Sequence, residues 1–117
     1  MSNSEKILLG ALLFIVAQSI SWFQLNLQFL YDWWKNKGFL AVLVFGIPCG
    51  LCYWYAWKLT TEGLGKSVWS ARFVSFGLSY LTFPALTYFL LKESIMTAKT
   101  LTCIALSVLI IIIQIFT

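Results

Sequence analysis

Arg72 carries the most distinctive chemistry in this 117-residue chain, because it is the only arginine. It lies near the start of an apolar segment that continues to Leu91 and contains several hydroxyl side chains. A guanidinium keeps its charge at any ordinary pH and can bind a phosphate or carboxylate through two parallel hydrogen bonds. Two interpretations stay open: Arg72 is an anion clamp, or it is an anchor that reaches the membrane interface.

Aromatic and small polar side chains surround Arg72 in the sequence. Trp69 and Ser70 precede it, and Ser75 and Tyr80 follow it in the same apolar segment. Ser70 can donate a further hydrogen bond to an anion that the arginine holds. We therefore expect Arg72 to face a cavity of the protein, or the level of the lipid headgroups, beside Trp69.

Gln18 and Ser21 place polar groups in the middle of the first apolar segment and share one face of a helix, with Trp22 one turn beyond Gln18. A side-chain amide in hydrocarbon is costly unless it is paired, so these side chains should face the interior of the protein. Two roles stay open: hydrogen bonds between helices, worth about 1 kcal/mol each, or contact with a substrate.

Cys49 and Cys52 form a C-x-x-C pair, a spacing that places both sulfur atoms on one face of a helix. One interpretation is a membrane thiol oxidoreductase that passes electrons to a quinone. Such a relay needs a second thiol pair, and only Cys103 remains. Cysteine is also a common small side chain in helix packing, and the pattern favours that role.

The residue types that most enzymes need are missing. The chain contains no histidine, and its acidic residues fall at predicted helix ends or in loops: Glu5, Asp32, Glu62 and Glu93. It therefore lacks both a set of metal ligands and a base beside any serine nucleophile. We expect that the protein is not an enzyme and that it uses no metal and no cofactor.

The composition indicates an integral membrane protein. Hydrophobic residues make up 61% of the chain, charged residues make up 10%, and the mean hydropathy is +0.88, values outside the range of soluble domains. Four apolar segments are long enough to span a bilayer, at approximately 7–30, 38–59, 67–91 and 98–116. Because the connections are short, consecutive helices should be antiparallel neighbours. The predicted fold is all-α: one transmembrane domain over 1–117, a four-helix bundle.

Positive charge is balanced across the predicted membrane. Lys6, Lys58, Lys66 and the borderline Arg72 fall on the side of the termini, and the remaining four lysines fall on the other side. The positive-inside rule therefore favours neither orientation. Either the chain inserts both ways and pairs with an inverted copy, or its context sets one orientation. The net charge of +4 reflects lysines that meet lipid headgroups, and we expect no nucleic-acid binding.

The layout of the segments resembles the drug/metabolite transporter superfamily in its smallest, single-repeat form. The likeness rests on "IVAQSIS" (15–21) in the first segment, on "VWSARFV" (68–74) at the start of the third, and on "LLKESIMTAKTLTCIALSVLIIIIQI" (90–115), which is similar to the family's last hairpin and its aliphatic dimerisation helix. It covers almost the whole chain. The resemblance implies a membrane carrier that works as a dimer.

Two groups within that superfamily are similar to this chain. The small multidrug-resistance proteins exchange protons for cationic drugs through a glutamate in helix one, but the matching region here has Gln18, which cannot bind and release a proton. Arg72 would also repel a cation. The small subunits that flip aminoarabinose linked to undecaprenyl phosphate are similar at "AQS", and an anionic headgroup suits Arg72. The resemblance thus implies anionic, zwitterionic or neutral cargo.

The predicted function is that of a small membrane transporter or lipid-headgroup flippase in a prokaryotic-type inner or plasma membrane. Its expected partners are membrane lipid and a second chain, in a homodimer of parallel or antiparallel subunits or in a heterodimer with a related chain. The alternative is a non-transporting structural or regulatory subunit of a larger membrane complex. A pore former is disfavoured, because few charged faces are available to line a channel.

A transporter requires a polar cavity between the first three helices, whereas a structural subunit predicts that those faces are packed shut. The residues that we expect to contact the substrate are Gln18, Ser21, Trp22, Tyr53, Trp69, Ser70, Arg72, Ser75 and Tyr80.

Overall fold

The computed structural model describes residues 2–93 and 97–116, and most of them lie in helices. The elements are α1 (Asn3–Leu30), the short 3₁₀ helix η1 (Asp32–Trp34), α2 (Gly38–Gly63), α3 (Val68–Leu91) and α4 (Ala98–Phe116). Each of α1 to α4 is long and apolar enough to cross a membrane. The predicted all-α fold with four membrane-spanning helices is therefore confirmed.

Several helix ends differ from the limits of the apolar segments. α1 begins at residue 3 and not at 7, because the Ser2 hydroxyl accepts a 3.2 Å hydrogen bond from the Glu5 backbone amide and caps the helix. α2 continues past 59 to Gly63, where its last turn packs against the start of α1. α3 begins one residue later than expected, because Ser67 is its cap. Part of the expected turn before α4, residues 94–96, lies outside the described residues.

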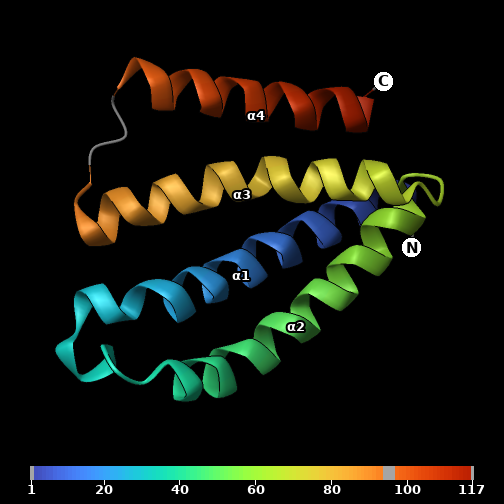
Figure 1. Cartoon of the computed structure of the whole chain (residues 1–117). Helices are drawn as coiled ribbons and strands as arrows, with labels where there is room; N and C mark the ends of the chain where they lie inside the picture. The colour runs from blue at the N-terminus through green and yellow to red at the C-terminus, as the bar shows by residue number, and fades with distance from the viewer. Residues whose placement is uncertain (1, 94–96, 117) are drawn as a thin grey trace.

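The helices lie side by side in the order α2, α1, α3, α4 (Figure 1). α1 packs against both α2 and α3, and α4 packs on α3. The Cα atoms extend over 45 × 36 × 19 Å, so the four helices form a slab. The start of α1, the end of α4 and the α2–α3 connection lie at one end of this slab (Figure 1). α2 and α3 meet at their connection and diverge away from it, with α1 between them (Figure 1).

Small residues allow neighbouring helices to approach closely. A Cβ atom added at Gly10 of α1 would overlap the Thr60 hydroxyl of α2 and lie 3.0 Å from the Thr60 backbone nitrogen. At Gly77 of α3, an added Cβ would lie 2.7 Å from Ile111 Cγ1 and 3.1 Å from the Ser107 carbonyl oxygen of α4. In lipid, burial of apolar surface provides little driving force between helices, so such close packing stabilises their association.

A small core forms where α1, α2 and α3 meet. It is a cluster of four buried side chains, Phe14, Ala56, Val74 and Leu78. At the end of the slab that holds the N-terminus, Lys6 Nζ lies 3.2 Å from Glu62 Oε2 and ties α1 to α2. Tyr53 and Trp57 of α2 pack against the edge of the core, and this contact positions both rings for the site described next.

Candidate functional site

A cavity of about 340 Å³ opens between α1, α2 and α3. Its walls combine aromatic rings with polar groups from three helices, and within the described residues they contain no acidic side chain. The lining residues on α3 share one helix face, because they are spaced three or four positions apart. The full lining is Gln18 from α1, Tyr53 and Trp57 from α2, and Arg72, Ser75, Phe76 and Ser79 from α3.

Gln18 forms the part of the wall that α1 contributes, and its side chain is only 1% exposed. Its Nε2 donates a 2.7 Å hydrogen bond to the backbone carbonyl of Ser75 on α3. Because only the NH₂ end of the amide can donate to a carbonyl, this contact assigns the two ends of the side chain. The other end, Oε1, is buried and has no hydrogen-bond partner among the described residues.

The Arg72 guanidinium lies over an aromatic ring and not beside a carboxylate. Its Cζ is 4.3 Å from the centroid of the Phe76 ring, which is a cation–π contact. Within the described residues the one ion pair joins Lys6 to Glu62, so no acidic side chain balances Arg72. A guanidinium stacked by its face keeps its N–H donors free at the edge. Arg72 therefore presents an unpaired positive charge to the cavity.

The depth of Arg72 suits a lipid headgroup. The 24-residue α3 is about 36 Å long, a few Å longer than the hydrocarbon core of a bilayer at roughly 30 Å. Arg72 follows Val68, the first residue of the helix, by four positions, or about 6 Å. A helix centred in the bilayer thus holds Arg72 close to the boundary between hydrocarbon and headgroups.

Apolar surface continues outward from the cavity along α2. Tyr53 and Trp57 also line a shallow groove of about 460 Å³ together with Gly50, Trp54 and Lys58. The Lys58 ammonium lies 5.7 Å from the centroid of the Trp54 ring. The groove therefore adds aromatic surface, with a second cation at its edge.

A third space of about 250 Å³ joins the cavity on the side of α3. It is lined by Trp57, Val68, Trp69 and Arg72. Trp57 lines all three spaces, so they are neighbours, and together we name them the α2–α3 cleft. The cleft comprises Gln18, Gly50, Tyr53, Trp54, Trp57, Lys58, Val68, Trp69, Arg72, Ser75, Phe76 and Ser79.

Five of the nine residues that the sequence pointed to lie in this cleft: Gln18, Tyr53, Arg72 and Ser75 in the cavity, and Trp69 in the adjoining space. Trp57 was missed, although it follows Tyr53 by one helical turn and so shares its face of α2. With Tyr53 among the expected residues, this spacing could have predicted Trp57 as well.

The other four expected residues lie outside the cleft lining. Trp22 is fully buried, and its Nε1 donates a 3.0 Å hydrogen bond to Thr87 Oγ1, which joins α1 to α3. The Ser70 hydroxyl accepts a 2.9 Å hydrogen bond from the Ser67 hydroxyl at the start of α3. Ser21 is half-buried and Tyr80 is exposed. Trp22 and Ser70 therefore have structural partners in place of a substrate.

The cysteine pair contributes to packing between helices. Cys49 is buried, and its thiol donates a 3.3 Å hydrogen bond to the Ala17 carbonyl of α1. Cys52 is half-buried, and both thiols are free. This arrangement agrees with the interpretation of the pair as small packing residues.

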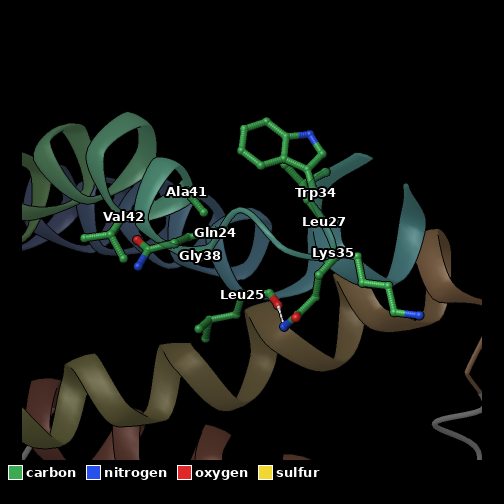
Figure 2. Close-up of a pocket in the computed structure, with 9 residues that line it drawn as sticks. Gln24, Leu25, Leu27, Trp34, Lys35, Gly38, Ala41 and Val42 are labelled. Atoms are coloured by element: carbon green, nitrogen blue, oxygen red, sulfur yellow. Dashed lines mark hydrogen bonds between the residues drawn. The ribbon is translucent and has the colours of Figure 1, made fainter. Parts of the chain in front are cut away.

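A second cavity, of about 200 Å³, lies at the opposite end of α1 (Figure 2). Gln28 Nε2 donates a 2.8 Å hydrogen bond to the Leu25 carbonyl of its own helix, and the Lys35 amine points away from the other lining side chains (Figure 2). The side-chain amide of Gln24 also lines this cavity (Figure 2). The lining is Gln24, Leu25, Leu27, Gln28, Trp34, Lys35, Gly38, Ala41 and Val42.

Comparison of the chain with protein-family models, with curated proteins and with solved structures finds no match.

Proposed function

We propose that this multi-pass membrane protein is a small transporter or lipid-headgroup flippase that binds its cargo in the α2–α3 cleft. One observation carries the proposal: the first three helices are not packed shut but leave a cavity lined by Gln18, Arg72, Ser75 and Ser79. Polar side chains are costly in a membrane, and those that line a cavity mark a substrate route. The likeness to the drug/metabolite transporter superfamily supports the same function.

The charges of the cleft favour anionic, zwitterionic or neutral cargo over a cationic drug. Arg72 and Lys58 are both cations, and no acidic side chain lies in the lining among the described residues. A carrier that exchanges protons for cations needs a titratable acid at the cargo site, and α1 offers Gln18 instead. An anion would gain charge-assisted hydrogen bonds from the free edge of the Arg72 guanidinium.

The working unit in this proposal is a dimer in a prokaryotic-type plasma membrane. The helices form a slab, and the cavity between α1, α2 and α3 is not fully enclosed but opens partly on one side. A second copy, or a related chain, would cover that side and enclose the cargo between two subunits, as in carriers built from repeated units.

A lipid-scrambling assay tests the proposal. Purified protein is reconstituted into liposomes that contain fluorescent phosphatidylglycerol, and dithionite bleaches the label in the outer leaflet. We expect dithionite to bleach more than half of the fluorescence, because lipid from the inner leaflet reaches the outer leaflet. This second phase of bleaching should be slower with Arg72→Ala. The matched control is Lys99→Ala, which removes a cation from the exposed start of α4, far from the cleft. Bleaching equal to that of protein-free liposomes would contradict a flippase for this lipid.

The alternative function, a structural subunit of a larger complex, is favoured by α4. Within this helix, Ser107 is the one buried residue among those described, so most of the surface of α4 is free to dock on another membrane protein. A structural subunit predicts no lipid movement in liposomes and normal activity of its complex when Arg72 is replaced. The scrambling assay therefore separates the two functions.

A further inference from the structure

The unpartnered oxygen of Gln18 is the starting point. Its Nε2 is engaged by the Ser75 carbonyl at 2.7 Å, which leaves Oε1 as a buried acceptor without a partner among the described residues. A buried acceptor costs free energy until a donor reaches it. The same side chain forms part of the cavity wall, so a group that enters the cavity is the natural source of that donor.

Arg72 lies about one helical turn before the residue of α3 that Gln18 contacts. Gln18 contacts α3 at Ser75, three positions after Arg72, which corresponds to about 5 Å along the helix axis. The guanidinium supplies donors only, and Gln18 Oε1 accepts only. The cavity thus offers two complementary functions at a short, fixed spacing: one for an anion and one for an N–H or O–H group.

The aromatic part of the cleft adds a place for apolar material. Tyr53, Trp54 and Trp57 line a shallow groove on α2 that shares Tyr53 and Trp57 with the cavity. A soluble anion would leave this aromatic surface uncovered, whereas the acyl chain of a lipid can pack against it.

We infer that the cargo is an anionic lipid whose headgroup also carries a hydrogen-bond donor, a hydroxyl or an ammonium, and that Gln18 Oε1 selects for this donor. The inference rests on the proposed function and deepens it. Arg72 binds the phosphate or carboxylate, Gln18 Oε1 accepts from the headgroup donor, and the groove on α2 receives the start of the acyl chains. In this scheme Gln18 determines specificity, and Arg72 supplies the general attraction for anions.

Two lipids with the same phosphodiester charge provide the test. Phosphatidylglycerol carries hydroxyl donors, and phosphatidylmethanol with the same acyl chains carries none. Each lipid is titrated into the detergent-solubilised full chain, and bound lipid is counted by native mass spectrometry. We expect phosphatidylglycerol to bind about fivefold more tightly, the difference that one net hydrogen bond produces. Equal binding of the two lipids by the unmodified protein overturns the inference and leaves the proposed function standing.

Gln18→Met assigns the preference to the side chain, because methionine has a similar length and no strong acceptor. We expect the variant to bind both lipids equally. The matched control is Asn26→Leu, which removes from α1 an amide that bonds to the Trp22 carbonyl of its own helix. This control should keep the fivefold preference. If Gln18→Met still prefers phosphatidylglycerol over phosphatidylmethanol, the proposed role of Gln18 is overturned. The comparison of the two lipids in the unmodified protein depends on neither variant.

A competition experiment distinguishes a lipid headgroup from a soluble phosphate compound as the source of the anion. Glycerol 3-phosphate and methyl phosphate are added as soluble competitors; both are phosphate monoesters, and only the first also carries hydroxyl donors. We expect neither to displace the lipid at concentrations equal to it, because neither fills the aromatic groove. Displacement by glycerol 3-phosphate at such concentrations overturns the assignment to a lipid. Binding of neither lipid overturns both this inference and an anionic-lipid cargo for the proposed function.

Discussion

Gln18 of α1 donates a 2.7 Å hydrogen bond to the backbone carbonyl of Ser75 on α3, across 57 positions of the chain. The contact holds the middle of α1 against the face of α3 that also carries Arg72. It explains how a polar side chain is accommodated within apolar helices, and it leaves the acceptor end of the amide buried, without a partner among the described residues. One residue thus links two helices and also lines the cavity that we propose as the cargo site.

Trp22 is expected to stabilise the fold and not to bind cargo. Trp22→Phe removes the 3.0 Å hydrogen bond to Thr87 and leaves a small void, so we expect a loss of about 1–3 kcal/mol in the free energy of unfolding. Thr87→Val leaves the indole N–H unpaired and should cost about 1 kcal/mol. Unfolding in mixed micelles measures both. Unchanged stability with reduced lipid binding would return Trp22 to the cargo site.

Gly10 is expected to be intolerant of a side chain. In Gly10→Ala the new Cβ meets the Thr60 hydroxyl and the backbone of α2, so the two helices must separate, at a cost of about 1–3 kcal/mol. Gly50→Ala is the matched control in the neighbouring helix, because nothing lies within 4 Å of its added Cβ. Alanine is the better helix former, so Gly50→Ala should be neutral or stabilising by up to about 1 kcal/mol. Equal melting temperatures for the two variants would argue against the close α1–α2 packing.

The sequence was a good guide to the number of helices and a partial guide to the site. Apolar segments bounded by lysines and aromatic belts fix where a chain can span a bilayer, so four helices were predictable. The helix ends were less predictable. The Ser2 cap extends α1 into a polar stretch that hydropathy alone assigns to a loop.

Cavity residues were predictable where a polar or charged side chain would be costly in contact with lipid. Gln18 and Arg72 are expensive in lipid, and both line the cavity. The partners of Trp22 and Ser70 were not predictable in the same way. The Trp22 bond to Thr87 depends on which faces of two distant segments meet, and Ser70 is engaged by a capping serine three positions earlier. Hydropathy and periodicity do not specify such pairings.

Quaternary ammonium drugs are not expected to be exported. α1 carries Gln18 and no acid to exchange protons for a cation, and Arg72 repels cationic cargo. Cells that express the protein should show the same minimum inhibitory concentrations for such drugs as cells with an empty vector. Clear resistance that disappears in Gln18→Ala would overturn this part of the account.

The balance of positive charge leaves two outcomes open, insertion in both orientations or one orientation set by context, and a tag at the C-terminus separates them. Lys6, Lys58 and Lys66 lie with Arg72 toward one end of the slab, and the remaining four lysines lie toward the other. If the chain inserts both ways, a C-terminal tag should be accessible from both sides of the membrane in comparable amounts. A tag found on one side in nearly every molecule would exclude an antiparallel homodimer and leave a parallel dimer or a heterodimer.

The most direct test of the proposed cargo site is the binding of phosphatidylglycerol to the unmodified protein and to Arg72→Lys. Lysine keeps the charge but loses the planar fork that binds a phosphate through two hydrogen bonds. We expect binding to weaken by roughly 1–2 kcal/mol, about fivefold to thirtyfold, with an unchanged unfolding midpoint. An interface anchor, by contrast, is served equally well by either long side chain. Equal affinity of the two proteins for phosphatidylglycerol would contradict an anion site at Arg72.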